Sequence, residues 1–221
     1  MSGPHDGRAK ILDLIPLEIR EKYEPLFHDI CHLHRKWGIF RQIFVSGENV
    51  VELLNGVAPG FFRVCKDLLA DDILLSISRL ADPKQTFKSD NLSLEQLIYS
   101  VDARQYPDLM RETEQLFRVA RDKCAFAREQ RNKRIAHNDL LTKLQAETLS
   151  SPTTTNVEAA LETIRALMNA IEKYFHEPVY CNDVNIAFVD YSRVLNVDGT
   201  QLITWLREAE ACKNEINSTI A

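Results

Sequence analysis

Residues that interrupt or turn a chain are scarce in this sequence, whose 221 residues include only 7 glycines and 8 prolines. A fold of many short strands needs a turn signal about every 8 to 12 residues, so this scarcity argues against an all-β protein and favours long helices. Hydrophobic residues make up 45% of the chain and charged residues 27%. That balance is typical of a globular protein and argues against a disordered chain. We therefore expect an all-α fold.

Long apolar runs are absent as well. No run approaches the roughly 20 residues of a membrane helix, and residues 1–10 are too polar to contain the apolar core of a signal peptide. The five cysteines include no CxxC pair; they are Cys31, Cys65, Cys124, Cys181 and Cys212. An odd number without close spacing is typical of reduced thiols in a reducing compartment. We expect a cytoplasmic protein with no membrane partner.

Positive charge is in short supply overall, because 27 Lys and Arg residues face 32 Asp and Glu residues, a net charge of −5. Such a chain is repelled by nucleic acid and by anionic membranes, so any contact with RNA requires a local basic patch. One exists at residues 118–134, where seven basic and two acidic side chains leave five positive charges. A run of charge is usually a solvated helix face, but this one leads directly to a histidine, His137.

Apolar residues spaced three and four apart predict where the helices lie. We expect helical segments at residues 18–45, 60–81, 94–101, 156–175 and 200–217, with a short piece of chain at 48–56 between the first two, and a longest helical segment running from Pro107 into the segment 131–137. Ser93 with Gln96, and Thr155 with Glu158, are typical of capping boxes at helix starts. Residues 82–92 are expected to form a polar loop and 148–156 a linker, while the alternation at 184–188 suits a strand.

The expected helix at 60–81 has apolar residues that can share one broad side: Phe61, Val64, Cys65, Leu68, Leu75 and Leu80. Its last turns also contain an acidic and basic cluster. Asp72 and Arg79 lie about two turns apart on one face, and Arg79 can pair with Asp82 three residues later. Asp71 and Asp72 are adjacent carboxylates, and paired carboxylates can perform acid–base chemistry. We nevertheless favour the interpretation that the residues of this cluster form structural ion pairs.

A metal site is the next candidate. His28, Cys31 and His32 can share one face of the first helix, and thiolate with imidazole is a ligand set for zinc. Structural zinc needs four ligands, and no second cluster supplies the remainder. We therefore favour a polar helix face beside one buried cysteine and predict no metal.

The segment Arg131-Asn132-Lys133-Arg134-Ile135-Ala136-His137 is the strongest chemical candidate. In metal-free RNA cleavage the ribose 2′-hydroxyl attacks the adjacent phosphate. His137 can move the proton near neutral pH, and Arg131 offers a planar, permanently charged fork to the phosphorane. Asn132 can hold a phosphate oxygen or fix the tautomer of the histidine. The candidate RNA-binding residues are Arg128, Lys133 and Arg134.

Geometry restricts how the two catalytic candidates can meet. Six residues of unbroken helix turn roughly 240° and rise about 9 Å, so Arg131 and His137 would diverge. Either the helix breaks between them, or Arg131 of one chain meets His137 of another across a two-fold axis. The second alternative predicts a symmetric homodimer.

The motif formed by Arg131, Asn132, Ala136 and His137 resembles the signature of HEPN proteins. The segments 78–83, 91–94 and 131–139 are similar to the AbiU-type abortive-infection branch of that superfamily, and the likeness covers roughly residues 15–175. It implies an up-and-down bundle of four to five main helices that dimerises through the motif helices. It also implies a cofactor-free, metal-independent endoribonuclease of a prokaryotic defence or toxin–antitoxin system.

One position departs from the family. Where many HEPN toxins have a tyrosine two residues after the histidine, this chain has Asp139, so control by nucleotide transfer to that tyrosine is not supported. Asp139 can instead orient His137, a hypothesis that full activity of an Asp139→Asn variant would exclude.

The resemblance also implies a domain organisation. We expect a flexible N-terminus at residues 1–15, a HEPN-like domain at 16–176, and an extension at 177–221 packed on the bundle. RNA is the expected substrate, and an antitoxin or regulatory protein is a further expected partner. The alternative is a non-catalytic HEPN-like dimer that binds a partner protein or a nucleotide, because many domains keep a fold and lose its chemistry.

Overall fold

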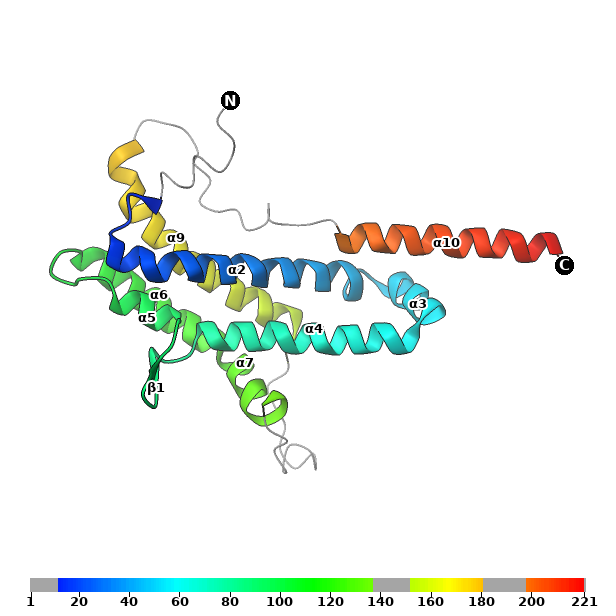
Figure 1. The fold of residues 1–221 in the computed structure, drawn as a ribbon, viewed down its shortest axis with the longest axis horizontal. Coiled ribbons are helices and arrows are strands. Elements are labelled where there is room, and N and C mark those ends of the chain that lie inside the picture. Colours follow the sequence, from blue (N-terminus) through cyan, green and yellow to red (C-terminus); the bar gives the residue numbers. More distant parts are fainter. Residues whose placement is uncertain (1–11, 137–151, 181–197, 221) are drawn as a thin grey trace. The chain divides into compact units, whose positions relative to one another are not determined.

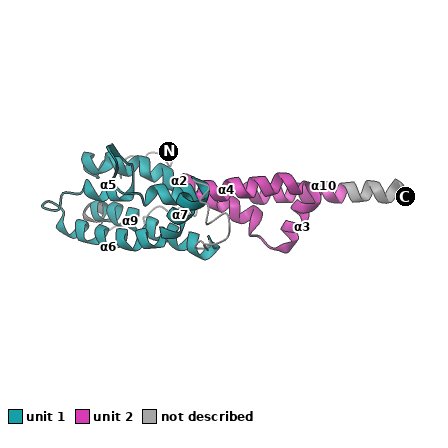
Figure 2. Ribbon diagram, turned by 90° about the horizontal axis from the view of Figure 1, so that it is seen from below, with its two compact units in different colours: residues 1–30, 74–190 teal, residues 31–73, 191–221 magenta. Residues whose placement is uncertain are grey.

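The computed structural model describes residues 12–136, 152–180 and 198–220, and for side chains it describes none of 177–180 or 213–220. These residues are almost entirely helical, so the predicted all-α fold is confirmed. The chain divides into two compact units, coloured teal and magenta in Figure 2: residues 1–30 with 74–190, and residues 31–73 with 191–221. The predicted domain boundaries at residues 16 and 176 stay a prediction.

Most helices begin and end close to where the sequence predicts them (Figure 1). The elements are α2 (Leu17–Phe44), α3 (Glu48–Val57), α4 (Pro59–Leu80), β1 (Gln85–Thr86), β2 (Ser89–Asp90), α5 (Leu94–Tyr99), α6 (Pro107–Lys123), α7 (Ala125–Gln130), η1 (Arg131–Ile135), α9 (Thr154–Tyr180) and α10 (Asp198–Ile220). Ser93 caps α5 as predicted, since its side chain accepts a hydrogen bond from the Gln96 backbone N–H at 3.4 Å. The strand suggested at residues 184–188 lies outside the described residues.

The core of the first unit is built on the contact between α6 and α9. Leu109 of α6 and Ile164 of α9 are both fully buried. The ring of Tyr106, just before α6, contacts Phe175 near the end of α9 edge-to-face, with centroids 5.2 Å apart. The start of α6 therefore meets the end of α9, and the two helices run antiparallel. Tyr23 of α2 joins the same core, because its hydroxyl donates a buried 2.6 Å hydrogen bond to Glu172.

Two helix boundaries differ from the prediction. The stretch from Pro107 neither is the longest helix nor runs unbroken into the motif: α6 has 17 residues against 28 for α2, and it ends at Lys123. Cys124, with ψ near −4°, interrupts the helix without any glycine or proline to mark the break. Helix α9 begins earlier than expected because Thr153, not Thr155, supplies the cap, accepting from the Asn156 N–H at 3.2 Å.

The segment predicted as a polar loop contains an antiparallel hairpin, β1–β2, in which Gln85 pairs with Asp90 and Thr86 with Ser89. Strands of two residues are too short to leave an alternating pattern in the sequence. Asn91 braces the hairpin, because its side-chain amide donates to the Pro83 carbonyl and to the Thr86 hydroxyl, both at 2.7 Å.

The second unit has a smaller core of its own. Its buried residues come from the end of α2, from α3 and from α10; they are Ile43, Val50, Leu53, Leu54 and Ile203. Gln42 accepts a hydrogen bond from the Thr200 N–H at 3.2 Å, which places the first turn of α10 beside the last turn of α2. Within the described residues, no helix is both long enough and apolar enough to cross a membrane.

The apolar side predicted for residues 60–81 is left uncovered in the first half of α4. Phe61, Val64 and Leu68 are 64%, 57% and 66% exposed, whereas Phe62 packs against the core of the second unit. Leu80, at the other end of the helix, is buried as predicted. Spacing of three and four residues shows that a helix has an apolar side, but it does not show whether another element covers that side.

Candidate functional site

The candidate motif begins in a distorted helix. Residues 131–135 form a short π-helix, η1, closed by a 2.8 Å hydrogen bond from the Ala136 N–H to the Arg131 carbonyl. This bond spans five residues, one more than in an α-helix, and such turns occur frequently at functional sites. The regular α-helical geometry that separates Arg131 from His137 therefore does not hold over these residues.

Arg131 is held by a carboxylate from a distant part of the chain. Its Nη1 donates to both carboxylate oxygens of Asp82, at 2.8 and 2.7 Å, and its Nε donates to the side-chain oxygen of Asn132 at 3.1 Å. The Arg131 and Asp82 side chains are only 23% and 18% exposed. The guanidinium is thus fixed in a half-buried position, in which an ionic pair is stronger than in open solvent.

This contact corrects the pairing inferred for the acidic cluster. Asp82 pairs with Arg131 and not with Arg79, while Asp72 pairs with Lys36 at 2.6 Å. Asp82 follows α4 and Arg131 begins η1, so the contact joins two of the segments on which the family resemblance rests. The interpretation of the cluster as structural ion pairs is confirmed for Asp72, whereas Asp82 belongs to the candidate site.

Donors remain for a substrate. Within the described residues, the hydrogen bonds of Arg131 use Nε and Nη1 and leave Nη2 for an outside acceptor. The same bonds occupy the side-chain oxygen of Asn132 and leave its amide nitrogen as a donor. Guanidinium and amide N–H groups are suited to phosphate oxygens. The site can therefore bind one phosphate without releasing Asp82.

The three basic residues proposed to bind RNA have different surroundings. Arg134 donates from Nε to Gln130 at 2.7 Å, and Lys133 is half-buried. The Nε of Arg128 is buried without an acceptor in the described part of the chain. Burial raises the pKa of the Cys124 thiol to about 12, an effect that the charge of nearby Arg128 partly opposes. The Arg128 guanidinium thus lies close to the protein interior.

The remaining predicted site residues are not placed. His137 and Asp139 lie outside the described residues, so the meeting of Arg131 with His137 stays a prediction. No three His, Cys, Asp or Glu side chains among the described residues are grouped closely enough to bind a metal ion.

The comparison with protein families decides what this bundle is. The model of the AbiU2 family of HEPN domains matches residues 17–186, well over half of the chain. The chain belongs to the AbiU2 family. Its helical bundle is therefore HEPN-like, as predicted, and it is a HEPN domain of the abortive-infection type. Comparison with curated proteins and with solved structures found no match.

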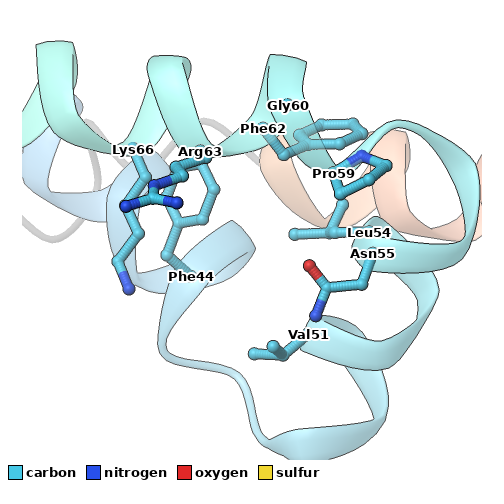
Figure 3. Close-up of a pocket in the computed structure, with 9 residues that line it drawn as sticks. All are labelled: Phe44, Val51, Leu54, Asn55, Pro59, Gly60, Phe62, Arg63 and Lys66. Atoms are coloured by element: carbon cyan, nitrogen blue, oxygen red, sulfur yellow. The ribbon is translucent and has the colours of Figure 1, made fainter.

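A cavity of this AbiU2 domain lies in the second compact unit (Figure 3). It is a cavity of about 380 Å³ at the turn from α3 to α4, with Phe44, Leu54 and Phe62 as apolar lining and Arg63 and Lys66 as its charged lining. No acidic residue lines it. This cavity could not be predicted from the sequence, because its residues come from three helices and form no local motif.

Asp82 is the site residue whose partner could not be predicted from the sequence. A carboxylate three residues after an arginine predicts a local pair, but the structure pairs Asp82 with an arginine 49 residues away. The one available signal was that both partners lie in segments that resemble the same family.

Proposed function

We propose that this AbiU2 HEPN domain is a metal-independent endoribonuclease with Arg131, Asn132 and His137 as its catalytic residues. The observation that supports this most is the fixation of Arg131 at the start of a π-turn, with Nη2 directed to no acceptor in the described residues. An arginine held in advance stabilises developing negative charge without the cost of reorganising during the reaction.

The proposed reaction uses these side chains, the RNA and water, which carries the proton that His137 does not. The 2′-hydroxyl loses its proton to a base and attacks the adjacent phosphorus, the bond to the 5′-oxygen breaks, and that oxygen takes up a proton. The products are a 2′,3′-cyclic phosphate and a 5′-hydroxyl. His137 is proposed to move one of these protons, while Arg131 and Asn132 bind the equatorial phosphorane oxygens.

Cleavage of a mixed pool of structured and unstructured RNA, with EDTA present, tests this proposal. The wild type should cleave, and the His137→Ala and Arg131→Ala variants should not. His28→Ala, which removes an exposed histidine of α2, is the matched control and should cleave like the wild type. Equal cleavage by the wild type and His137→Ala would contradict the proposal.

We further propose that the active form is a cytoplasmic homodimer with each site shared across the two-fold axis. Mixing Arg131→Ala with His137→Ala subunits tests this directly. A heterodimer of the two restores one complete site if Arg131 and His137 come from different chains, and it restores none if they come from one chain. Recovery of part of the wild-type rate is the expected result.

The second candidate function is a non-catalytic HEPN dimer that binds a partner protein, such as an antitoxin or a regulator. The pairing of Arg131 with Asp82 favours it, because an arginine in an ion pair also serves a purely structural role. The same cleavage assay separates the candidates: RNA left intact by the wild type, in the presence and in the absence of Mg²⁺, supports partner binding.

A further inference from the structure

A cavity beside the hairpin has a composition suited to a nucleotide. It has a volume of about 340 Å³ and lies between α5 and α6 in the first unit. Its apolar part is formed by Ile98 and Phe117, which are 5% and 9% exposed, and by the ring of Tyr99, which is 68% exposed. Pockets of roughly 300 Å³ and more hold small organic ligands, so one base with its sugar fits this volume.

One cation lies over the exposed ring, and two more line the same cavity. The Lys84 ammonium lies 3.2 Å from the centre of the Tyr99 ring, and Arg118 and Arg121 line the same cavity from α6. An aromatic face next to several cations is the combination with which proteins bind single-stranded nucleic acid, because bases stack on the ring while the cations attract the phosphates.

Two carboxylates also line the cavity, and each already has a partner. Glu95 accepts a 2.6 Å hydrogen bond from the Lys84 backbone N–H, and Glu114 lies 4.0 Å from Arg118 in an exposed pair. Such exposed pairs contribute little to stability. Arg118 can therefore turn to a phosphate at little cost, and the three cations exceed the two carboxylates by one charge.

The hairpin next to Lys84 has an exposed ring of its own, which does not line the cavity. Phe87 at its tip is 99% exposed and has a φ of 55°, a conformation that is rare and unfavourable for a bulky side chain. Lys88 follows it directly. An exposed aromatic ring on a backbone of this kind buries no apolar surface, and strained residues cluster at functional sites.

A short piece of chain connects the cavity to the candidate motif. Lys84 comes two residues after Asp82, so their Cα atoms are at most about 7 Å apart, and Asp82 holds Arg131. Both belong to the first unit. The cavity is therefore connected through Lys84 and Asp82 to the arginine that is proposed to bind a phosphate.

We propose that this cavity is a subsite for one nucleotide of single-stranded RNA, with the base stacked on Tyr99 and the backbone held by Lys84, Arg118 and Arg121. The choice of RNA as the ligand rests on the proposed function. A single strand is required because the bases of a duplex are already stacked on each other and do not reach a protein ring. The subsite selects unpaired RNA for the cleavage motif.

Binding is measured with full-length His137→Ala protein, so that cleavage does not interfere, using a fluorescein-labelled 12-nucleotide RNA of mixed sequence and fluorescence anisotropy. Tyr99→Ala should raise Kd roughly ten-fold, whereas Tyr99→Phe, which keeps the ring, should bind like the parent. Arg121→Gln should weaken binding and reduce the slope of log Kd against log salt by about 0.7, the single-strand value for one phosphate contact.

Arg111→Gln is the matched control for Arg121→Gln, because it removes the same charge from an exposed position of α6 outside the cavity. The subsite is excluded if Tyr99→Ala changes Kd by less than two-fold, if Arg111→Gln has the same effect as Arg121→Gln, or if the parent does not bind the RNA. Equal competition by polyglutamate and by unlabelled RNA would also exclude it, since any polyanion would then suffice.

The subsite and the proposed function fail separately in these measurements. Ring-dependent binding by a protein whose wild type cleaves no RNA leaves the subsite standing and removes the nuclease. Cleavage by the wild type together with unchanged binding by Tyr99→Ala removes the subsite alone.

Discussion

Arg131 and Asp82 are 49 residues apart in the chain and form a half-buried pair in which one guanidinium nitrogen binds both carboxylate oxygens. This pair connects the residue after α4 to the first residue of the motif. It limits the rotation of the arginine and leaves one of its nitrogens for an acceptor outside the described residues. In the proposed ribonuclease, Asp82 is a positioning residue that acts through Arg131.

Asp82→Asn should therefore reduce RNA cleavage while leaving the fold intact. The amide keeps the shape of the side chain but loses the charge that fixes Arg131, and a misplaced catalytic group reduces kcat by up to about 100-fold. Single-turnover cleavage with saturating enzyme measures the effect. Asp67→Asn, an exposed carboxylate of α4 in the second unit, is the control. A rate equal to that of the control would show that Asp82 has no positioning role.

The buried contact between Tyr23 and Glu172 should contribute measurably to stability. Tyr23→Phe removes the donor of a 2.6 Å hydrogen bond to a carboxyl group that is 3% exposed. The expected loss in the free energy of unfolding is about 1–3 kcal/mol, measured by urea denaturation. Tyr99→Phe makes the same chemical change at an exposed ring and should alter the free energy by less than about 0.5 kcal/mol. Equal effects of the two substitutions would contradict this assignment.

The ends of long helices could be predicted from the sequence because proline, glycine and apolar spacing act locally. Helix α4 begins at Pro59 and ends just before Pro83, within a residue or two of the prediction. The break at Cys124 could not be predicted, since that position has no residue that disfavours helix. The Cys124 side chain is fully buried, and burial by distant residues has no local signature in the sequence.

The candidate site likewise has a part that could be predicted from the sequence and a part that could not. Arg131, Asn132 and the basic run could be identified from residue types and spacing alone. The partner of Arg131 could not, because Arg79 is three residues from Asp82 and a local pair is the simplest expectation. The exposed face of Phe61, Val64 and Leu68 shows the same limit. A sequence pattern reports which residues can be covered, and only the tertiary structure reports which are.

Two glycines at equivalent helix positions should respond in opposite ways to alanine. A Cβ added at Gly199, the second residue of α10, would lie 2.8 Å from the Gln42 Cβ and 3.2 Å from the Ile43 Cγ1, so α10 must shift. A Cβ at Gly60, the second residue of α4, meets nothing within 4 Å. Alanine should therefore destabilise the second unit at Gly199 and stabilise it by up to about 1 kcal/mol at Gly60.

Hydrogen exchange of the amides of α10 measures this difference locally. Faster exchange in Gly199→Ala, with unchanged or slower exchange in Gly60→Ala, is the expected result. Equal exchange in both variants would mean that the first turn of α10 is not packed on α2.

Cys124 should be chemically inert although it lies only seven residues before Arg131. Burial raises the pKa of its thiol from the ordinary value of 9.0 to about 12, and only the thiolate reacts with alkylating reagents. Iodoacetamide at pH 8 should therefore modify the exposed Cys212 and leave Cys124 unmodified until urea unfolds the protein. Peptide mass spectrometry of both cysteines before and after unfolding measures this, and Cys212 is the internal control.

The same raised pKa predicts how stability depends on pH. The folded protein keeps the Cys124 proton at pH values where the unfolded chain has lost it, so the contribution is complete below about pH 9 and is lost as the pH rises towards 12. Cys124→Ala should therefore lose less stability between pH 8 and pH 10.5 than the wild type does, measured as the change in urea midpoint. Parallel loss in both proteins, or rapid labelling of Cys124 in the folded state, would show that the thiol at the break between α6 and α7 is open to solvent.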